Sequence, residues 1–345
     1  MQRSCCLFAI LSVLFFRGAV VADECKFNAE RWESILSDVR TRASAKGISD
    51  STINATLRNP AFIPSIVKSD KNQSEFKLTL QEYLNRTANS TRIARGHQMR
   101  GKYPTLLTRV DNTYGVPPHV ILAFWGMESN YGEVKSRHRL VDAFFTLIYD
   151  GRREKFFSEQ LIALMKIADD NELDINSIRG SWAGAMGHFQ FIPTTLATYG
   201  VDGNGDSHID IINSISDAMA SAGNYLGKLG WNKNERIVRR VVLPGNFDTN
   251  LLDGKTKKSL TEWARMGILN PDGTPIPTGN MIAGLVADVA NLSIQSADDF
   301  NPDTDIAPMP VITAYLTYPN FYRIKKWNNS NWYAIAIAEL ADKLK

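Results

Sequence analysis

Glu128 is the carboxylate whose sequence setting points most directly to chemistry. It ends the run from His119 to Glu128, which is otherwise almost wholly apolar and follows a Pro-Pro helix start. Ile121, Trp125 and Glu128 are spaced i, i+4 and i+7, so a helix would place them on one face. Burial raises the pKa of a carboxylic acid and lets it carry a proton near neutral pH, as a general acid for glycosidic cleavage must. A capping or ion-paired glutamate near a helix end fits the spacing equally well.

A glycine-rich segment, Gly180–Pro193, is the second candidate. Its small residues allow a ligand or another helix to approach closely. Ser181 and Gln190 could give polar contacts to a sugar, and Trp182 could stack on one. The segment is not a phosphate loop, because it lacks Gly-Lys-Ser/Thr at the required spacing. For the small residues alone, we favour tight helix packing.

The segment from residue 202 to 213 has the rhythm of a calcium loop. Side-chain oxygens recur at loop positions 1, 3, 5 and 9, and position 7 would give its backbone carbonyl. The corresponding residues are Asp202, Asn204, Asp206, His208 and Asp210. Ser207 replaces the usual glycine at position 6, and Asn213 replaces the closing acid at position 12. We therefore predict a weak structural calcium site, and the alternative is an Asx-rich turn without metal.

Arg152, Arg153 and Tyr225 are weaker candidates. The two arginines precede Glu154 and a predicted helix, where they could reach a cleft or form a solvated helix start. Tyr225 follows a predicted helix and could pack in the core or donate its hydroxyl to a ligand. No His-Glu-x-x-His and no Gly-x-Ser-x-Gly occurs, which excludes a zinc protease of that type and gives an α/β-hydrolase no support.

The composition is that of an ordinary globular protein. Among the 345 residues, 44% are hydrophobic and 22% charged, which excludes a disordered chain and a multi-span membrane protein. The formal net charge is +3 and no polybasic block occurs, so nucleic acid is not implied as a partner. A near-neutral balance suits a neutral polymer such as a glycan.

Residues 1–22 form a secretory signal peptide pattern, with cleavage predicted after Ala22. Arg3 precedes an apolar stretch, and small residues end the segment. The stretch is too short for a membrane span, which needs about 20 apolar residues. Cleavage leaves Cys25 as the last of the three cysteines, so no internal disulfide can form. We expect an exported protein, and an uncleaved anchor is the alternative.

The remaining chain divides into four parts by pattern. Residues 23–100 are predicted as an N-terminal helical segment, in which Leu80 and Tyr83 recur at helical spacing. Residues 101–235 show dense helical patterning with glycine loops. Residues 236–279 read as a small mixed subdomain with β-prone runs and two turn signals. Residues 280–345 return to the main body and end in an amphipathic helix.

Together these motifs resemble those of the B-type lytic murein transglycosylases, glycoside hydrolase family 103. The matching segments lie in the same order and spacing from about residue 75 to the C-terminus. They are Tyr114–Pro118, Gly126–Gly132, Val141–Phe144, Gly180–Pro193, the Asp202 loop, Gly223–Leu226 and Tyr322–Ser330. The resemblance implies a mainly α (α+β) protein: a lysozyme-like helical catalytic core with a small mixed β subdomain and an EF-hand-like loop.

The resemblance also implies a reaction, cleavage of the MurNAc–GlcNAc β-1,4 bond of peptidoglycan by a carbon–oxygen lyase. Glu128 falls on the family's single catalytic acid. It would protonate the glycosidic oxygen and then take the proton of the C6 hydroxyl, which attacks C1 and gives 1,6-anhydro-MurNAc. A single carboxylate suffices for this, whereas ordinary glycosidases use two. The chemistry requires no cofactor.

By motif position, Ser181, Gln190, Tyr225 and Asn328 fall on glycan-groove residues, as do Tyr83, Arg152 and Arg153. The metal loop falls on Asp202, Asn204, Asp206 and His208. Trp327 stands where the family commonly has tyrosine, and Asn213 stands where an acid would close the calcium loop.

Two other functions compete with this prediction. A hydrolytic muramidase would need a second carboxylate or a placed water opposite Glu128. A non-catalytic peptidoglycan-binding protein on the same fold would not need Glu128 at all. We expect a periplasmic monomer whose partners are glycan strands and other cell-wall proteins.

Overall fold

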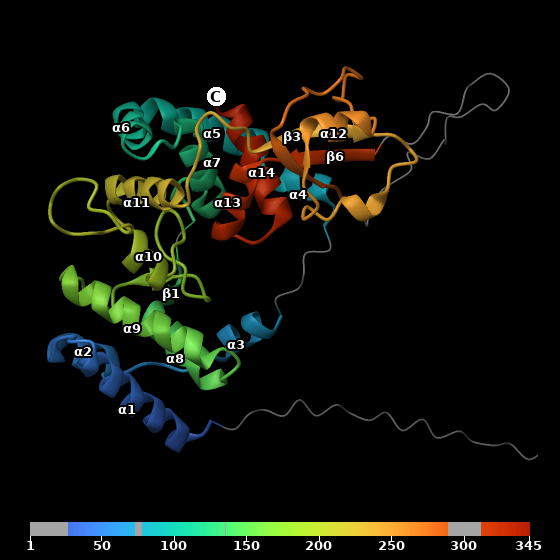
Figure 1. The fold of residues 1–345 in the computed structure, drawn as a ribbon. Helices are drawn as coiled ribbons and strands as arrows, with labels where there is room; N and C mark the ends of the chain where they lie inside the picture. Colours follow the sequence, from blue (N-terminus) through green and yellow to red (C-terminus); the bar gives the residue numbers. More distant parts are fainter. Residues whose placement is uncertain (1–26, 73–77, 135, 289–311) are drawn as a thin grey trace, which may run out of the picture.

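The computed structural model describes residues 27–72, 78–134, 136–288 and 312–345 (Figure 1). The predicted signal peptide and Cys25 lie outside these ranges. The described chain is mostly helical. Its helices are α1 (Ala29–Ala45), α2 (Asp50–Leu57), α3 (Pro64–Lys71), α4 (Leu80–Thr87), α5 (Ser90–Lys102), α6 (Pro104–Tyr114), α7 (Pro118–Ser129), α8 (Leu140–Asp150), α9 (Glu154–Asp170), α10 (Pro193–Tyr199), α11 (Ile215–Lys228), α12 (Leu260–Arg265), α13 (Pro319–Trp327) and α14 (Asn331–Lys343).

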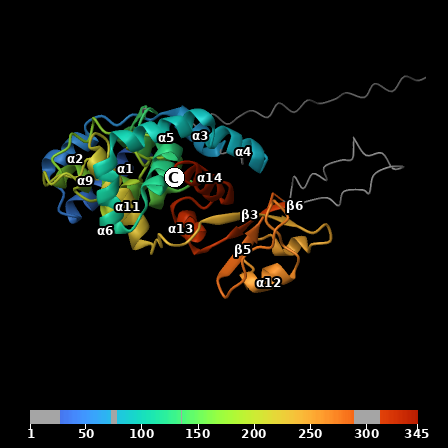
Figure 2. The same cartoon turned by 90° about the horizontal axis from the view of Figure 1, so that it is seen from above.

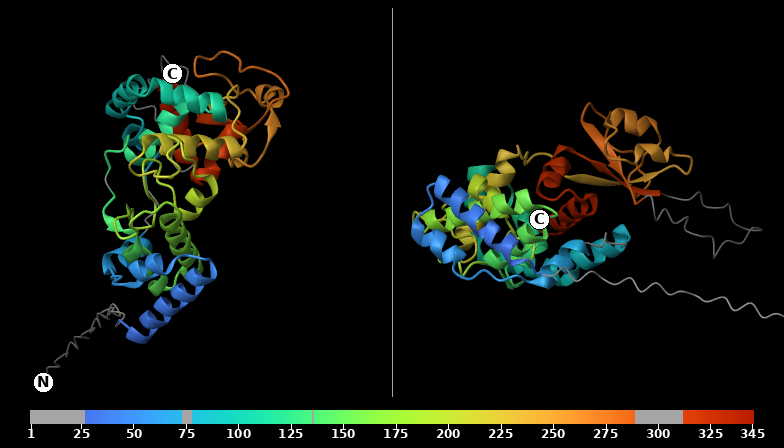
Figure 3. Two further views of the ribbon diagram at one scale, coloured as in Figure 1. Left: turned by 90° about the vertical axis from the view of Figure 1, so that its left-hand side faces the viewer. Right: turned by 90° about the horizontal axis from the view of Figure 1, so that it is seen from below.

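The helical body has two groups of helices. In one group, α1, α2 and α3 pack against α8 and α9; in the other, α5, α6, α11 and α14 surround α7, and α4 packs on α14. Helix α10 packs against both α9 and α11 and joins the groups. Figures 1 and 3 show the first group at one end of an elongated body and the second group at the other.

Helix α7 is the central helix of the second group. Pro118 occupies its first turn, where a missing N–H costs nothing. Every residue from Val120 to Gly126 is buried, as expected for a helix that is apolar on all sides. Helix α14 lies against it with a run of small and branched residues, Ala334 to Ala338, all buried. The apolar run seen in the sequence is therefore a core helix that carries Glu128 at its end.

A four-stranded antiparallel sheet forms a separate lobe with its own core (Figure 2). Its order is β3 (Val238–Leu243), β6 (Ile312–Thr317), β5 (Ile282–Val286) and β4 (Lys258–Ser259). Trp263 of α12 is fully buried in this core, and its Nε1 donates to the carbonyl of Ala283 at 2.9 Å. The sheet thus takes strands from both sides of residue 280, where we placed the end of the mixed subdomain.

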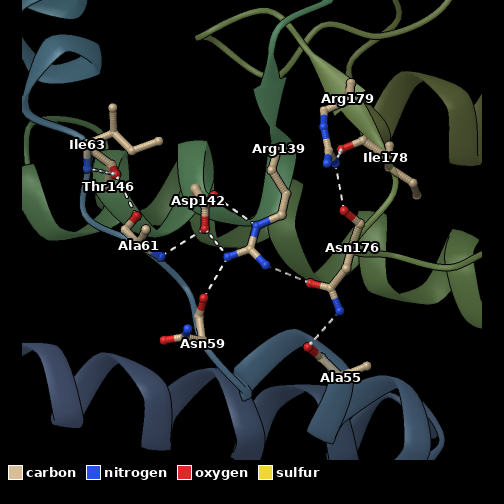
Figure 4. A network of polar contacts seen from close by, with 10 residues as sticks. All are labelled: Ala55, Asn59, Ala61, Ile63, Arg139, Asp142, Thr146, Asn176, Ile178 and Arg179. Atoms are coloured by element: carbon tan, nitrogen blue, oxygen red, sulfur yellow. Dashed lines mark hydrogen bonds and ion pairs between the residues drawn. The ribbon is translucent and has the colours of Figure 1, made fainter.

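A two-stranded ribbon, β1 (His138–Arg139) and β2 (Arg179–Gly180), supports the glycine-rich segment. The guanidinium of Arg139 binds Asp142, the side chain of Asn176 at 3.1 Å and the carbonyl of Asn59 at 2.6 Å (Figure 4). Arg139 therefore joins the segment after α2 to helix α8 and to the residues that lead into β2. This network fixes the strand from which the Ser181 loop begins.

Each helix in the described residues is too short or too polar to span a membrane.

Candidate active site

A sharp turn directly after Glu128 ends helix α7. Asn130, Tyr131 and Gly132 follow each other in the left-handed region, with φ of 49°, 61° and 82°. The turn folds the Tyr131 ring back against α7, where a Cβ on Gly126 would lie 2.8 Å from its ring and hydroxyl. Glycine at position 126 is therefore required for this close approach. The carboxyl group of Glu128 is held at a rigid helix end.

Glu128 is only partly exposed, and it receives two hydrogen bonds on one oxygen. The indole Nε1–H of Trp327 donates to its Oε1 at 3.0 Å, and the Tyr333 hydroxyl donates to the same atom at 2.5 Å. Burial raises the pKa of Glu128 to about 7, while the two hydrogen bonds act in the lowering direction. A carboxyl group with this pKa is protonated in about half of the molecules at neutral pH, as a general acid requires.

Glu133 is the next acid along the chain, and it points elsewhere. Its carboxylate forms an ion pair with Arg95 of α5 and accepts a hydrogen bond from the Asn130 side chain at 2.5 Å. In the described residues, no carboxylate is among the groups that shift the pKa of Glu128. In the described part of the chain, the site therefore shows one acid, Glu128, without the facing carboxylate that hydrolytic glycosidases use.

Tyr83 reaches the same site from helix α4. Its pKa is raised by burial and by the nearby charge of Glu128, and Tyr83 in turn contributes to the raised pKa of Tyr333. Arg92 of α5 fastens α4 by donating from its guanidinium to the carbonyl of Thr87. Three helices that are distant in the sequence thus bring Tyr83, Glu128 and Tyr333 together.

Ser181 begins a tight loop in the glycine-rich segment. Its Oγ accepts the backbone N–H of Ala185 at 3.0 Å, and its own N–H donates to the Ala185 carbonyl at 2.7 Å. Gly184 has φ of +92°, and a Cβ there would lie 2.3 Å from the ring of Phe144. The Ser181 hydroxyl proton remains available to donate to a ligand.

Gln190 stands at the other end of this segment, in the left-handed region at φ 49°. Its Nε2 donates to the carbonyl of Gly187 at 2.9 Å, which leaves its Oε1 without a protein partner in the described residues. The neighbouring His188 accepts the indole N–H of Trp125 on Nδ1 at 3.0 Å, and its carbonyl accepts the Ser129 hydroxyl at 2.6 Å. The segment is therefore bonded directly to the helix that carries Glu128.

Tyr225 of α11 lies inside a stack of three aromatic rings. Its ring stacks on Tyr199 at 4.3 Å and on Trp327 at 4.9 Å between centroids, and its hydroxyl donates to the Lys326 carbonyl at 3.1 Å. Asn328 follows Trp327 at the end of α13 with an exposed side chain. The structure therefore connects Tyr225 and Asn328 to Glu128 through Trp327.

Arg152 and Arg153 are engaged with a buried carboxylate of α3. Both guanidinium groups bind Asp70 at 2.6 Å, and the Asp70 side chain is 1% exposed. Burial acts to raise the pKa of Asp70, but the bonds and charges of the two arginines outweigh it and leave that pKa lowered. Among the described residues, no hydrogen bond or ion pair joins either arginine to Glu128 or its partners.

The loop at residues 202–213 is closed by its own hydrogen bonds. Asp202 accepts the N–H groups of Gly205 at 2.6 Å and Ser207 at 2.7 Å. Asp217, fully buried on α11, accepts the N–H groups of Gly203 and Asp210, each at 2.9 Å. The carboxylate of Asp217 thus ties the two ends of the loop together.

The candidate ligands of the loop bind one another. Asp206 accepts the His208 N–H at 2.9 Å on one oxygen and the Asn204 side chain at 2.7 Å on the other. The residues that the structure describes contain no group of three or more acidic, histidine or cysteine side chains placed to hold a metal ion. The carboxylates of Asp202 and Asp206 thus accept hydrogen bonds from within the loop itself.

Three residues of the site were missed in the sequence. Tyr333 lies in the last helix, Tyr199 ends α10, and His188 lies in the glycine-rich segment without any motif of its own. Tyr333 and Tyr199 have no local signal, because their roles arise from packing against α7 and α11. His188 offered one cue, a histidine between the small residues and Gln190.

This arrangement, a single protonatable glutamate at the end of a buried helix beside a glycine-rich loop, belongs to a known class. Residues 31–342 match the family model described as the transglycosylase SLT domain. The chain belongs to this family.

One curated relative is the membrane-bound lytic murein transglycosylase B of Escherichia coli (strain K12). It is 32% identical over 244 residues, which are 69% of this chain and 60% of that protein. The alignment thus spans less than two thirds of the relative.

Solved structures of the same family have the same fold. SltB3 of Pseudomonas aeruginosa, in complex with NAG-anhNAM-pentapeptide, is 34% identical with a TM-score of 0.81, covering 91% of this chain and 79% of SltB3. SltB1 of the same organism is 25% identical with a TM-score of 0.74, covering 90% and 98%. The lytic transglycosylase Slt35 of Escherichia coli, in complex with calcium, is 26% identical with a TM-score of 0.73, covering 91% and 92%. These matches confirm the lysozyme-like, mainly helical fold that the motifs predicted.

Proposed function

We propose that this protein is a lytic transglycosylase that cleaves the MurNAc–GlcNAc β-1,4 bond of peptidoglycan. The observation that carries the proposal is Glu128, a lone carboxyl group whose burial raises its pKa to about 7. Family membership and the SltB3 complex with an anhydro-sugar peptide support the same substrate.

In the proposed reaction, Glu128 acts first as an acid and then as a base. Its proton passes to the glycosidic oxygen as the bond from that oxygen to C1 of MurNAc breaks. The resulting carboxylate takes the proton of the C6 hydroxyl as that oxygen bonds to C1. The N-acetyl group assists at C1. The product is a 1,6-anhydro sugar, no water is consumed, and Glu128 ends in its starting protonation state.

The surrounding residues divide into two kinds. Three residues have polar groups that can bind the glycan, because these groups have no protein partner in the described residues: Ser181, Gln190 and Asn328. Tyr83 lies beside the acid. Tyr225 acts indirectly: it stacks on the ring of Trp327, which donates a hydrogen bond to Glu128.

We assign Arg152 and Arg153 to glycan binding, the role that their motif positions predict. Their side chains stay 46% and 37% exposed while both bind Asp70. Asp70 fixes their direction.

The proposed chemistry requires no cofactor. The weak calcium site expected from the spacing of the 202–213 segment stays a prediction, and Asp217 ties the two ends of that segment together. We further propose that the protein is exported to the periplasm with cleavage after Ala22 and acts as a monomer, with other cell-wall proteins as partners.

The test is mass analysis of muropeptides released from purified peptidoglycan by the wild-type protein and by Glu128→Gln. The wild type should release anhydro-MurNAc ends, which are lighter than reducing ends by one water. Glu128→Gln should bind glycan but release nothing, because the amide keeps the shape and cannot carry the proton. Reducing ends would indicate a muramidase. Binding without release by the wild type would indicate a non-catalytic wall protein.

A further inference from the structure

The two oxygens of the Glu128 carboxyl group have different surroundings. Oε1 accepts the Trp327 indole N–H at 3.0 Å and the Tyr333 hydroxyl at 2.5 Å. Oε2 has no hydrogen-bond partner among the described residues, and it is not a buried atom that lacks one. Oε2 therefore faces the open side of the site.

Both donors to Oε1 keep their protons. An indole N–H can only donate a hydrogen bond, so Trp327 cannot accept one from a protonated carboxyl group. Tyr333 is buried, and its pKa is raised well above its ordinary value by that burial and by the Glu128 charge. While Tyr333 donates as it does here, the two donors use both acceptor directions of Oε1 and leave no place for a carboxylic proton on it.

We propose that Trp327 and Tyr333 together confine the acidic proton of Glu128 to Oε2, and that Trp327 is a positioning residue for catalysis. This inference rests on the proposed function of Glu128. The same oxygen, Oε2, then gives its proton to the glycosidic oxygen and takes the proton of the C6 hydroxyl. The carboxyl group does not have to rotate between the two steps.

The packing around Trp327 matches a positioning role. One face of its indole stacks on Tyr225 at 4.9 Å, and Tyr225 is covered on its other face by Tyr199 at 4.3 Å. Phe124 and Phe191 lie at 4.7 and 5.1 Å from the same indole, tilted or edge-on. One face of the indole is therefore taken by Tyr225, and its N–H is aimed at the carboxyl group.

The position of Phe124 explains why the indole N–H of Trp327 meets the Glu128 carboxyl group. Phe124 and Glu128 are four residues apart on α7, so they lie on one face of that helix. An indole packed on Phe124 therefore meets the carboxyl group one turn later. A tyrosine at this place could accept as well as donate a hydrogen bond. Tryptophan can only donate, so the direction of its hydrogen bond to Glu128 is fixed.

The titratable groups around this carboxyl group come from three other helices. They are Tyr83 on α4, Tyr333 on α14 and Arg92 on α5, which acts on Tyr83. None of them is a carboxylate, so the titration of Glu128 is expected to be a single step in the neutral range.

The test uses Trp327→Phe and Tyr333→Phe, each of which removes one donor and keeps a ring. Trp231→Phe is the matched control, because the Trp231 Nε1–H is buried without a partner. The ¹³C carboxyl signal of Glu128 is titrated by NMR, and turnover is measured from the release of anhydro ends.

In either variant we expect the pKa of Glu128 to rise by about one, because a donor that stabilises the carboxylate is lost. Turnover should fall about tenfold with KM within about twofold of wild type, because the proton can then occupy Oε1. Trp231→Phe should match wild type in both measurements.

An unchanged Glu128 titration in Trp327→Phe would overturn the proton placement. A rise in KM at constant turnover would make Trp327 a sugar contact and would also overturn it. These outcomes are distinct from failure of the proposed function, because the titration needs no turnover and the wild type alone reveals the product.

Discussion

Replacing Glu128 by glutamine should stabilise the fold, and only at a pH where the wild-type carboxyl group is ionised. Glutamine keeps the shape of the side chain and can still accept hydrogen bonds from Trp327 and Tyr333. It has no charge to bury. The variant therefore separates the structural cost of the acid from its chemistry.

The magnitude follows from the pKa of Glu128, which burial raises from 4.5 to about 7. A group with a raised pKa holds its proton longer in the folded than in the unfolded chain, so stability falls as the pH rises through this range. At about 1.36 kcal/mol for each tenfold change, the cost reaches about 3 kcal/mol above pH 7 and vanishes below pH 4.5. In a protein of this size, that corresponds to about 4 °C in Tm.

The assay is thermal unfolding of wild type and Glu128→Gln at pH 4 and at pH 8.5, followed by circular dichroism. The two proteins should melt together at the lower pH, and the variant should melt about 4 °C higher at the upper pH. Glu133→Gln is the control, since Glu133 is half-exposed and paired with Arg95, and it should give no gain at pH 8.5. A difference in Tm that is the same at both pH values would refute the burial argument.

Three further predictions concern other parts of the account. Turnover should fall about tenfold per pH unit above pH 7, because Glu128 must be protonated to act, and constant turnover up to pH 9 would contradict that role. Asp70→Asn should cost about 2 kcal/mol in urea unfolding at pH 7, since it leaves Arg152 and Arg153 without their carboxylate. Because the pKa of Asp70 is lowered, this loss should begin to shrink as the pH falls below 3.8 and should disappear below the pKa of the folded state. A loss that persists at still lower pH would refute the ion-pair explanation. Millimolar calcium should raise Tm by less than about 1 °C, because Asp217 already closes the loop, and a larger shift would establish a calcium site there.

The sequence predicted the parts of the site that depend on one local segment. Glu128 lies at the end of an apolar run, and a run apolar on all sides can only be a buried helix. The raised pKa of its carboxyl group follows from that burial. The glycine-rich segment and the β-prone run at residues 238–243 were visible for the same reason, since both are local patterns.

The remaining parts depend on pairs of segments far apart in the chain. Tyr333 and Trp327 meet Glu128 across about 200 residues. Trp327 lies in a segment that resembles a family motif, but nothing local shows that either side chain reaches Glu128. Arg152 and Arg153 have the composition of a ligand-binding pair, but their contact with Asp70 arises from the packing of α3 on α8. The rhythm of the 202–213 loop was visible, whereas its closure by Asp217 depends on how α11 folds back on it.

The most direct test of the central claim is digestion of purified peptidoglycan in water enriched in oxygen-18, with mass analysis of the released ends. If Glu128 acts as the single acid and base with the C6 hydroxyl as nucleophile, every new end should be 1,6-anhydro-MurNAc and should carry no label. Labelled reducing ends formed in proportion to turnover would show that water attacks C1, and would contradict the account.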